Sequence, residues 1–143
     1  MFKNVLFATD FGPSSKRAET LAIEVAQRFG AKLTVVHVYE IPSYVYAGVP
    51  YTPADLVTPI REGAREALDQ DIAAIRTKMP DAVALLRSGY AADEILKVIK
   101  ETHADLIVLG THGRRGVPRA LLGSVAEKLV RTSPIPVLTV HGQ

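Results

Sequence analysis

The chain has 143 residues, of which 48% are hydrophobic and 22% are charged, with 17 Lys and Arg against 15 Asp and Glu. This composition excludes intrinsic disorder as the default, and the length favours one domain, which we expect to span residues 1–143. The chain has no cysteine, which excludes disulfides, cysteine-based zinc or iron–sulfur sites and a cysteine nucleophile.

Charge and hydropathy favour neither nucleic acid nor a membrane as a partner. The net charge is only +2, which is too small for the clustered basic face of a nucleic-acid-binding protein. No apolar run approaches the roughly 20 residues of a membrane span. Residues 1–4 lead straight into an apolar run, so we expect no signal peptide and a cytoplasmic location.

Short apolar runs alternate with longer segments of helical spacing. The first run, Val5–Ala8, is continuously apolar, and such a run is typical of a strand buried on both faces of a parallel sheet. Strands are expected at residues 5–8, 33–38, 82–86, 106–109 and 136–140. Helices are expected at about residues 13–29, 54–79, 92–99 and 122–130.

This alternation predicts an α/β fold with a single doubly wound, open, parallel five-stranded sheet and helices on both faces. Right-handed crossovers leave few topologies, of which we favour strand order 3-2-1-4-5. The first and fourth strands are then neighbours, and ligands of such sheets bind at this switch point. Asp10 and Gly110, which end these two strands, are expected side by side at its mouth.

Residues 39–53 form a long predicted loop that is rich in proline and glycine. A loop of this length is often a lid or a contact surface. Tyr44, Tyr46 and Tyr51 would form an aromatic lid or a partner surface, and packing of the loop onto its own domain is an equal alternative.

The segment from Gly110 to Val125 carries the clearest chemistry. Gly110 and Gly113 remove side chains where a ligand would approach the backbone. A helix start at Gly123 and Ser124 would point unpaired N–H groups and one hydroxyl outward, at the positive end of the helix dipole. These features suit a phosphate cradle. Because the segment has neither the Walker A nor the G-x-G-x-x-G spacing, a loop whose glycines only make turns is an equal alternative.

The ordered set of motifs resembles one family over essentially the whole chain. The pattern G-x-x-G, nine residues and G-[ST] is met by Gly110, Gly113, Gly123 and Ser124, and the first strand ends in Ala-Thr-Asp at Asp10. In these motifs the chain is similar to the nucleotide-binding class of the universal stress protein family.

The resemblance implies that ATP lies across the switch point. Asp10, with Ala8 beside it, would contact the adenosine. Val38 would meet the adenine through its backbone, and Leu109 and Gly110 would lie along the ribose.

The resemblance also implies how the phosphates are held. Mg²⁺ would bridge phosphate oxygens, with no metal ligand from the protein expected. The phosphates would be contacted by Thr111, His112, Gly113, Arg114, Arg115, Gly123, Ser124 and Val125. The ring of His112 would touch a phosphate, or the residue would contribute only its backbone to a turn. The Arg114–Arg115 pair would strengthen triphosphate binding or face solvent.

Other polar residues have simpler explanations than catalysis. Asp10 has no convincing catalytic partner, so no catalytic residue is assigned. His37 is expected to be a satisfied histidine of the core. Ser14 and Ser15 are expected to cap the first helix, because no G-x-S-x-G elbow is present.

The last strand, Pro136 to Val140, is apolar and lies at the predicted sheet edge. An exposed edge invites pairing with another chain, and the resemblance implies a homodimer through this strand.

The leading hypothesis is a cytoplasmic, ATP-binding, regulatory dimer of the stress response that acts on an unknown protein partner. The alternatives are a slow ATPase or phosphotransferase that uses the same pocket, and a ligand-free, chaperone-like interaction dimer. Fast catalysis usually needs a positioned base, and none is evident. The glycines at 110, 113 and 123 count against the ligand-free alternative.

Overall fold

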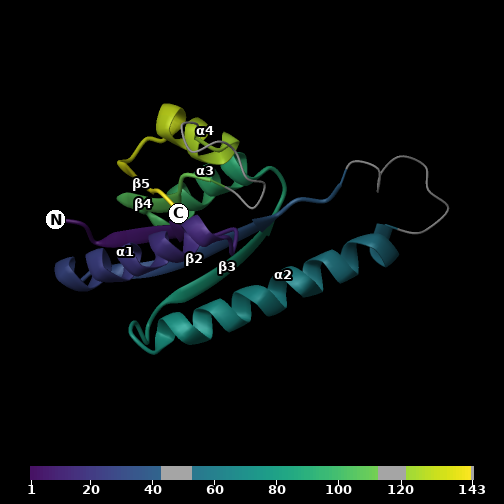
Figure 1. The fold of residues 1–143 in the computed structure, drawn as a ribbon, viewed down its shortest axis with the longest axis horizontal. Coiled ribbons are helices and arrows are strands. Elements are labelled where there is room, and N and C mark those ends of the chain that lie inside the picture. Colours follow the sequence, from purple (N-terminus) through teal and green to yellow (C-terminus); the bar gives the residue numbers. More distant parts are fainter. Residues whose placement is uncertain (43–52, 113–121, 143) are drawn as a thin grey trace.

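The computed structural model describes residues 1–42, 53–112 and 122–142. Strands and helices alternate strictly through these residues, as the sequence predicted (Figure 1). In chain order they are β1 (Asn4–Ala8), α1 (Pro13–Phe29), β2 (Lys32–Tyr39), α2 (Pro53–Arg76), β3 (Val83–Ser88), α3 (Ala91–Thr102), β4 (Leu106–Gly110), α4 (Ser124–Thr132) and β5 (Val137–Val140).

The sheet has the order β3-β2-β1-β4-β5, and every pair of neighbouring strands is parallel. Both features confirm the predicted topology. Ala8, the last residue of β1, is in register with Val36 of β2 and with Leu109 of β4. The carboxyl ends of β1 and β4 therefore lie side by side where the chain reverses its direction of winding, which is where α/β sheets bind ligands.

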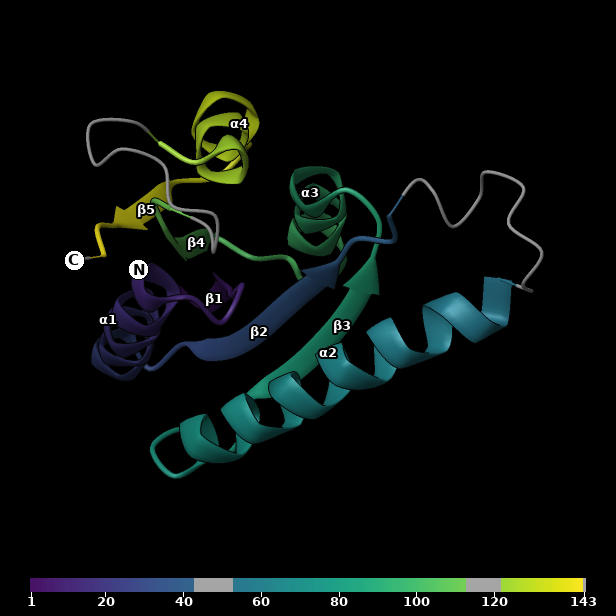
Figure 2. The same ribbon diagram turned by 45° about the vertical axis from the view of Figure 1, so that its right-hand side comes forward.

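Helices cover both faces of the sheet (Figure 2). α1 and α2 lie on one face, and α3 and α4 lie on the other. Residues of β1 alternate between the two cores: Val5 and Phe7 pack with α1 and α2, whereas Leu6 and Ala8 pack with α3 and α4. This double burial is the physical reason for the continuous apolar run in the sequence, since each face of the strand meets a helix.

The helix boundaries differ from the predictions by a few residues. Gly30 ends α1 in the left-handed conformation, with φ at 63°, which confirms the predicted C-cap. α2 contains Pro59 within its first turns and ends at Arg76, three residues before the predicted end. Residues 43–52, with the three tyrosines of the predicted lid, lie outside the described residues. Within the described part of the chain, no helix is long and apolar enough to cross a membrane.

Candidate functional site

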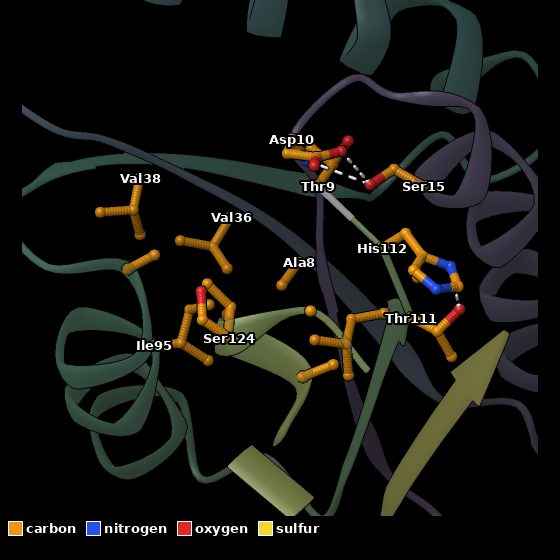
Figure 3. A pocket seen from close by; sticks show the side chains of 16 residues that line it. Ala8, Thr9, Asp10, Ser15, Val36, Val38, Ile95, Thr111, His112 and Ser124 are labelled. Atoms are coloured by element: carbon orange, nitrogen blue, oxygen red, sulfur yellow. Dashed lines mark hydrogen bonds between the residues drawn. The ribbon is translucent and has the colours of Figure 1, made fainter. Parts of the chain in front are cut away.

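A pocket opens at the carboxyl end of the sheet, between β1, β2 and β4 and the first turns of α3 and α4 (Figure 3). Its volume is about 590 Å³ when the part open to solvent is included. Ten predicted site residues line it: Ala8, Asp10, Val38, Leu109, Gly110, Thr111, His112, Gly123, Ser124 and Val125. The other three, Gly113, Arg114 and Arg115, lie outside the described residues, so their role stays a prediction.

Six residues that the sequence reasoning missed also line the pocket. They are Thr9, Ser15, Val36, Ala91, Ile95 and Ala126. Val36 could have been found, because it lies two residues before Val38 and so faces the same side of β2. Ala91 and Ile95 carry no motif. They reach the pocket because the crossover from β3 to β4 carries α3 over this face of the sheet.

One part of the pocket is an apolar slot between β2 and α3. Val36 and Val38 come from β2, and Ala91 and Ile95 come from the first two turns of α3. Figure 3 shows the side chains of Val36, Val38 and Ile95 grouped on one side of the pocket, with Ala8 beside them. A slot lined by aliphatic side chains favours a flat, weakly polar group of a ligand over a charged one.

The first turn of α4 provides hydrogen-bond donors. The N-cap is Gly123, and no side chain caps the helix. Glu127 N–H donates to the Gly123 carbonyl, 2.9 Å away, so the amides of Ser124, Val125 and Ala126 precede the first intrahelical donor. These three residues line the pocket at the positive end of the helix dipole. This end of the pocket is therefore suited to an anion.

The amide of Gly123 is used differently. It donates to the carbonyl of Thr111 over 2.6 Å, so the helix amides that remain for a ligand begin at Ser124. The backbone of Gly123 is extended, with φ at −62° and ψ at 158°, which any residue can adopt. Backbone conformation therefore does not require glycine at this position.

Asp10 presents a fixed carboxylate at the pocket wall. Its Oδ1 accepts a hydrogen bond from the Ser15 hydroxyl at 2.6 Å (Figure 3) and another from the Gly12 amide at 2.8 Å. The Asp10 amide donates to Ser15 Oγ at 3.1 Å. The predicted capping of α1 by Ser14 and Ser15 is wrong. The N-cap is Gly12, without a side-chain bond, because both serine hydroxyls bind other groups.

Gly110 owes its small size to packing against α1. A Cβ atom at this position would collide with Ser14 Oγ and would lie 2.7 Å from the Ser14 carbonyl carbon. Gly142 is crowded by the same residue, with a Cβ atom 2.6 Å from Ser14 Cβ. Close packing of a helix is therefore enough to require glycine at this position, and close approach of a ligand to Gly110 stays a prediction.

Ser14 also fixes the backbone of His112. Its hydroxyl donates to the His112 carbonyl at 2.8 Å and accepts from the His112 amide at 3.3 Å. The buried Thr111 hydroxyl lies 3.0 Å from Nδ1 of His112 and 3.3 Å from Nδ1 of His141. The backbone at His112 is therefore held by α1, and its ring turns toward Thr111 (Figure 3).

His37 is a satisfied histidine at the edge of the core, which confirms its prediction. Its Nδ1 lies 2.7 Å from the carbonyl oxygen of Thr9, and its ring packs against Phe11 with centroids 4.3 Å apart.

Two groups with shifted pKa values lie on the other face of the sheet. Lys16 of α1 binds the buried Asp71 of α2 at 2.5 Å and Glu19 at 3.4 Å. Burial, together with the nearby Asp71 carboxylate, raises the pKa of Glu19 above its usual 4.5. Burial lowers the pKa of Lys16, but the bonds to Asp71 and Glu19 outweigh it and leave that pKa raised. This cluster joins α1 to α2 and belongs to the scaffold.

The fold and the pocket together define a doubly wound α/β protein with a ligand pocket at its switch point. The family model described as the universal stress protein family matches residues 1–141. A universal stress protein of Thermus aquaticus is 38% identical over 142 residues, which cover 99% of this chain and 100% of the relative. The chain belongs to the universal stress protein family.

Solved structures of the same family share the fold. The universal stress protein UspA from Lactobacillus plantarum superposes with a TM-score of 0.78 at 26% identity, covering 96% of this chain and 97% of that chain. A universal stress protein in complex with cAMP superposes with a TM-score of 0.67 at 30% identity, covering 99% of this chain and 98% of that chain.

Proposed function

We propose that this universal stress protein binds an adenine nucleotide, ATP with Mg²⁺, in the pocket at the switch point. It would act in the cytoplasm as a homodimer whose nucleotide state is read by a protein partner. The observation that carries the proposal is the pairing of an apolar slot with the uncapped start of α4 in one cavity. The solved relative in complex with cAMP supports the same ligand class.

The chemistry of the walls gives the nucleotide a direction. The base fits the slot of Val36, Val38 and Ile95, where aliphatic side chains exclude water from its faces. Asp10 can only accept hydrogen bonds and repels phosphate, so it suits the sugar. The phosphates then lie at the amides of Ser124 and Val125, where the helix dipole favours negative charge.

The remaining phosphate contacts follow the family pattern. They are assigned to Gly113, Arg114 and Arg115, with Leu109 and Gly110 along the sugar. Thr111 and His112, whose amides already donate to Val140 and Ser14, are assigned only to the pocket wall. The described part of the chain contains no group of three or more His, Cys, Asp or Glu side chains that could hold a metal ion. Mg²⁺ that accompanies the nucleotide would be held by phosphate oxygens and water, because Mg²⁺ gives up its bound water reluctantly.

The proposed dimer uses β5. In the described residues this strand pairs only with β4, so its outer edge offers backbone N–H and C=O groups to a second copy. The Thr111 amide donates to the carbonyl of Val140, the last residue of β5, at 2.9 Å. This bond ties the edge strand to the pocket and offers a route by which nucleotide occupancy could affect the dimer.

Two rival functions fit the site less well. A ligand-free interaction module would have no use for a pocket that is lined by the open amides of a helix start. A fast ATPase needs a group that accepts or orients a proton. Of the titratable side chains among the described residues that line the pocket, Asp10 is assigned to the sugar and His112 turns its ring toward Thr111, so neither is assigned to proton transfer.

The test is ligand release followed by titration. The purified protein is denatured and the supernatant is analysed for adenine nucleotide, and ATP with Mg²⁺ is then titrated against thermal stability. At about 100 times Kd, the ligand should add about 2.7 kcal/mol to the free energy of unfolding. Absence of both bound nucleotide and a thermal shift would contradict the proposal. A turnover number above about 1 s⁻¹ would favour an enzyme instead.

A further inference from the structure

The carboxylate of Asp10 is held through only one of its two oxygens. Oδ1 accepts from the Ser15 hydroxyl at 2.6 Å and from the Gly12 amide at 2.8 Å. Among the described residues, Oδ2 receives no hydrogen bond. Because Asp10 lines the pocket, Oδ2 is the oxygen that remains for a ligand.

Ser15 lines the pocket, and its hydroxyl is bonded to Asp10. Its hydroxyl has a single hydrogen, which goes to Oδ1, and a lone pair of the same oxygen accepts the Asp10 amide at 3.1 Å. The residue is 3% exposed. With its hydrogen engaged, the hydroxyl has no donor left for a ligand, and its effect is to fix where the carboxylate points (Figure 3).

A carboxylate selects its partner by what it can accept. In an adenine nucleotide the hydrogen-bond donors are the ribose hydroxyls and the amino group of the base. The base lies in the slot of Val36, Val38 and Ile95, and the phosphates are repelled by a second negative charge. The ribose hydroxyls are therefore the partners that suit Oδ2 of Asp10.

We propose that Ser15 is a positioning residue that holds the Asp10 carboxylate toward the ribose and thereby sets a preference for ribonucleotides over deoxyribonucleotides. The inference rests on the proposed binding of ATP and adds to it the residue that determines sugar specificity. Without the Ser15 hydroxyl, Oδ1 keeps one donor, and the carboxylate gains rotational freedom about its Cβ–Cγ bond.

Isothermal titration calorimetry with ATP, 2′-deoxy-ATP and 3′-deoxy-ATP tests the inference. A hydroxyl bonded to a charged group should make ATP bind about tenfold more tightly than at least one deoxy analogue. Ser15→Ala should reduce this ratio to about threefold or less, and Ser15→Thr, which keeps a hydroxyl, should restore it. The ratio is the informative readout, because general damage to the pocket weakens all three nucleotides alike.

Ser14→Ala is the matched control. Ser14 precedes Ser15 on α1 and is also 3% exposed, but its hydroxyl binds His112. This variant should keep the ratio. In an Asp10→Ala background, Ser15→Ala should change the ratio no further, because the group through which it acts is gone.

The outcomes separate the two proposals. If the wild-type protein binds no ATP, the proposed function fails. If it binds ATP and Ser15→Ala keeps the full preference for ribose, the positioning role is wrong. If removal of Mg²⁺ with EDTA abolishes the preference in the wild type, Asp10 serves the metal ion and the inference is overturned.

Discussion

Gly110→Ala tests the packing of α1 against the end of β4. In the structure, a Cβ atom at Gly110 lies 2.7 Å from the Ser14 carbonyl carbon and 2.9 Å from Ser14 Cβ, whereas ordinary contacts begin at 3.4 Å. The backbone of α1 must therefore move away by about 0.7 Å, because a change of side-chain rotamer cannot relieve a clash with backbone atoms.

The expected cost is substantial. Overpacking against a well-packed neighbour costs about 1–3 kcal/mol, and the upper end applies here because backbone atoms must move. For a chain of this size, about 3 kcal/mol corresponds to a decrease in Tm of roughly 6–12 °C. Urea and thermal unfolding of the two proteins measure both quantities.

Two further variants serve as controls for this test. Gly63 lies within α2, and a Cβ atom there meets nothing within 4 Å, so Gly63→Ala should stabilise by about 0.5–1 kcal/mol. The double variant Gly110→Ala, Ser14→Ala should stay destabilised, because the Ser14 backbone is still in the way. A Gly110→Ala protein within about 0.5 kcal/mol of the wild type would refute the packing explanation, since exposed, unconstrained substitutions fall in that range.

Three further predictions concern the pocket and the α1–α2 cluster. Gly123→Val should leave the fold intact, because the φ and ψ of Gly123 suit any residue. The valine side chain should fill the space beside α4 and abolish ATP binding in calorimetry, and unchanged affinity would contradict the phosphate assignment. Lys16→Ala should lower the free energy of unfolding in urea by about 1–2 kcal/mol, because it leaves the buried Asp71 unpaired. The loss is no larger because Lys16 itself is half exposed, and an unchanged free energy of unfolding would contradict this role. Because the pKa of Glu19 is raised, the folded state holds that proton more tightly than the unfolded state, so stability falls as pH rises above 4.5 through the raised value. Glu19→Gln should therefore lose less stability than the wild type between about pH 4 and about pH 7, and an equal loss would show that Glu19 does not contribute.

The strand order and the place of the pocket could be predicted because they depend on local patterns. Continuous apolar runs such as Val5–Ala8 mark strands that are buried on both faces, and the alternation with helices leaves few topologies. The sequence also pointed to Asp10 and to Ser124, since residues that follow neighbouring parallel strands or begin the next helix must meet at the carboxyl edge of the sheet.

The partners of individual side chains could not be predicted, because they depend on contacts between distant parts of the chain. Ser14 and His112 are 98 positions apart, and Lys16 and Asp71 are 55 positions apart. The close packing of α1 against Gly110 is a contact that no feature of the glycine-rich segment itself reveals.

Local rules also named the wrong partners for the serines of α1. A serine at a helix start is usually a cap, yet here the cap position falls on Gly12. The hydroxyls of Ser14 and Ser15 lie in the helix and reach His112 and Asp10 instead. Tertiary contacts therefore decided what these residues do, and those contacts connect α1 to the pocket.

The most direct test of the central claim follows the backbone amides of the pocket by NMR while ATP and Mg²⁺ are added. The amide signals of Ser124, Val125 and Ala126 should shift on binding. Those of Val98 and Ile99, which are buried in the second half of α3, should move little. Binding of ATP with no change at the start of α4 would contradict the claim that these helix amides hold the phosphates.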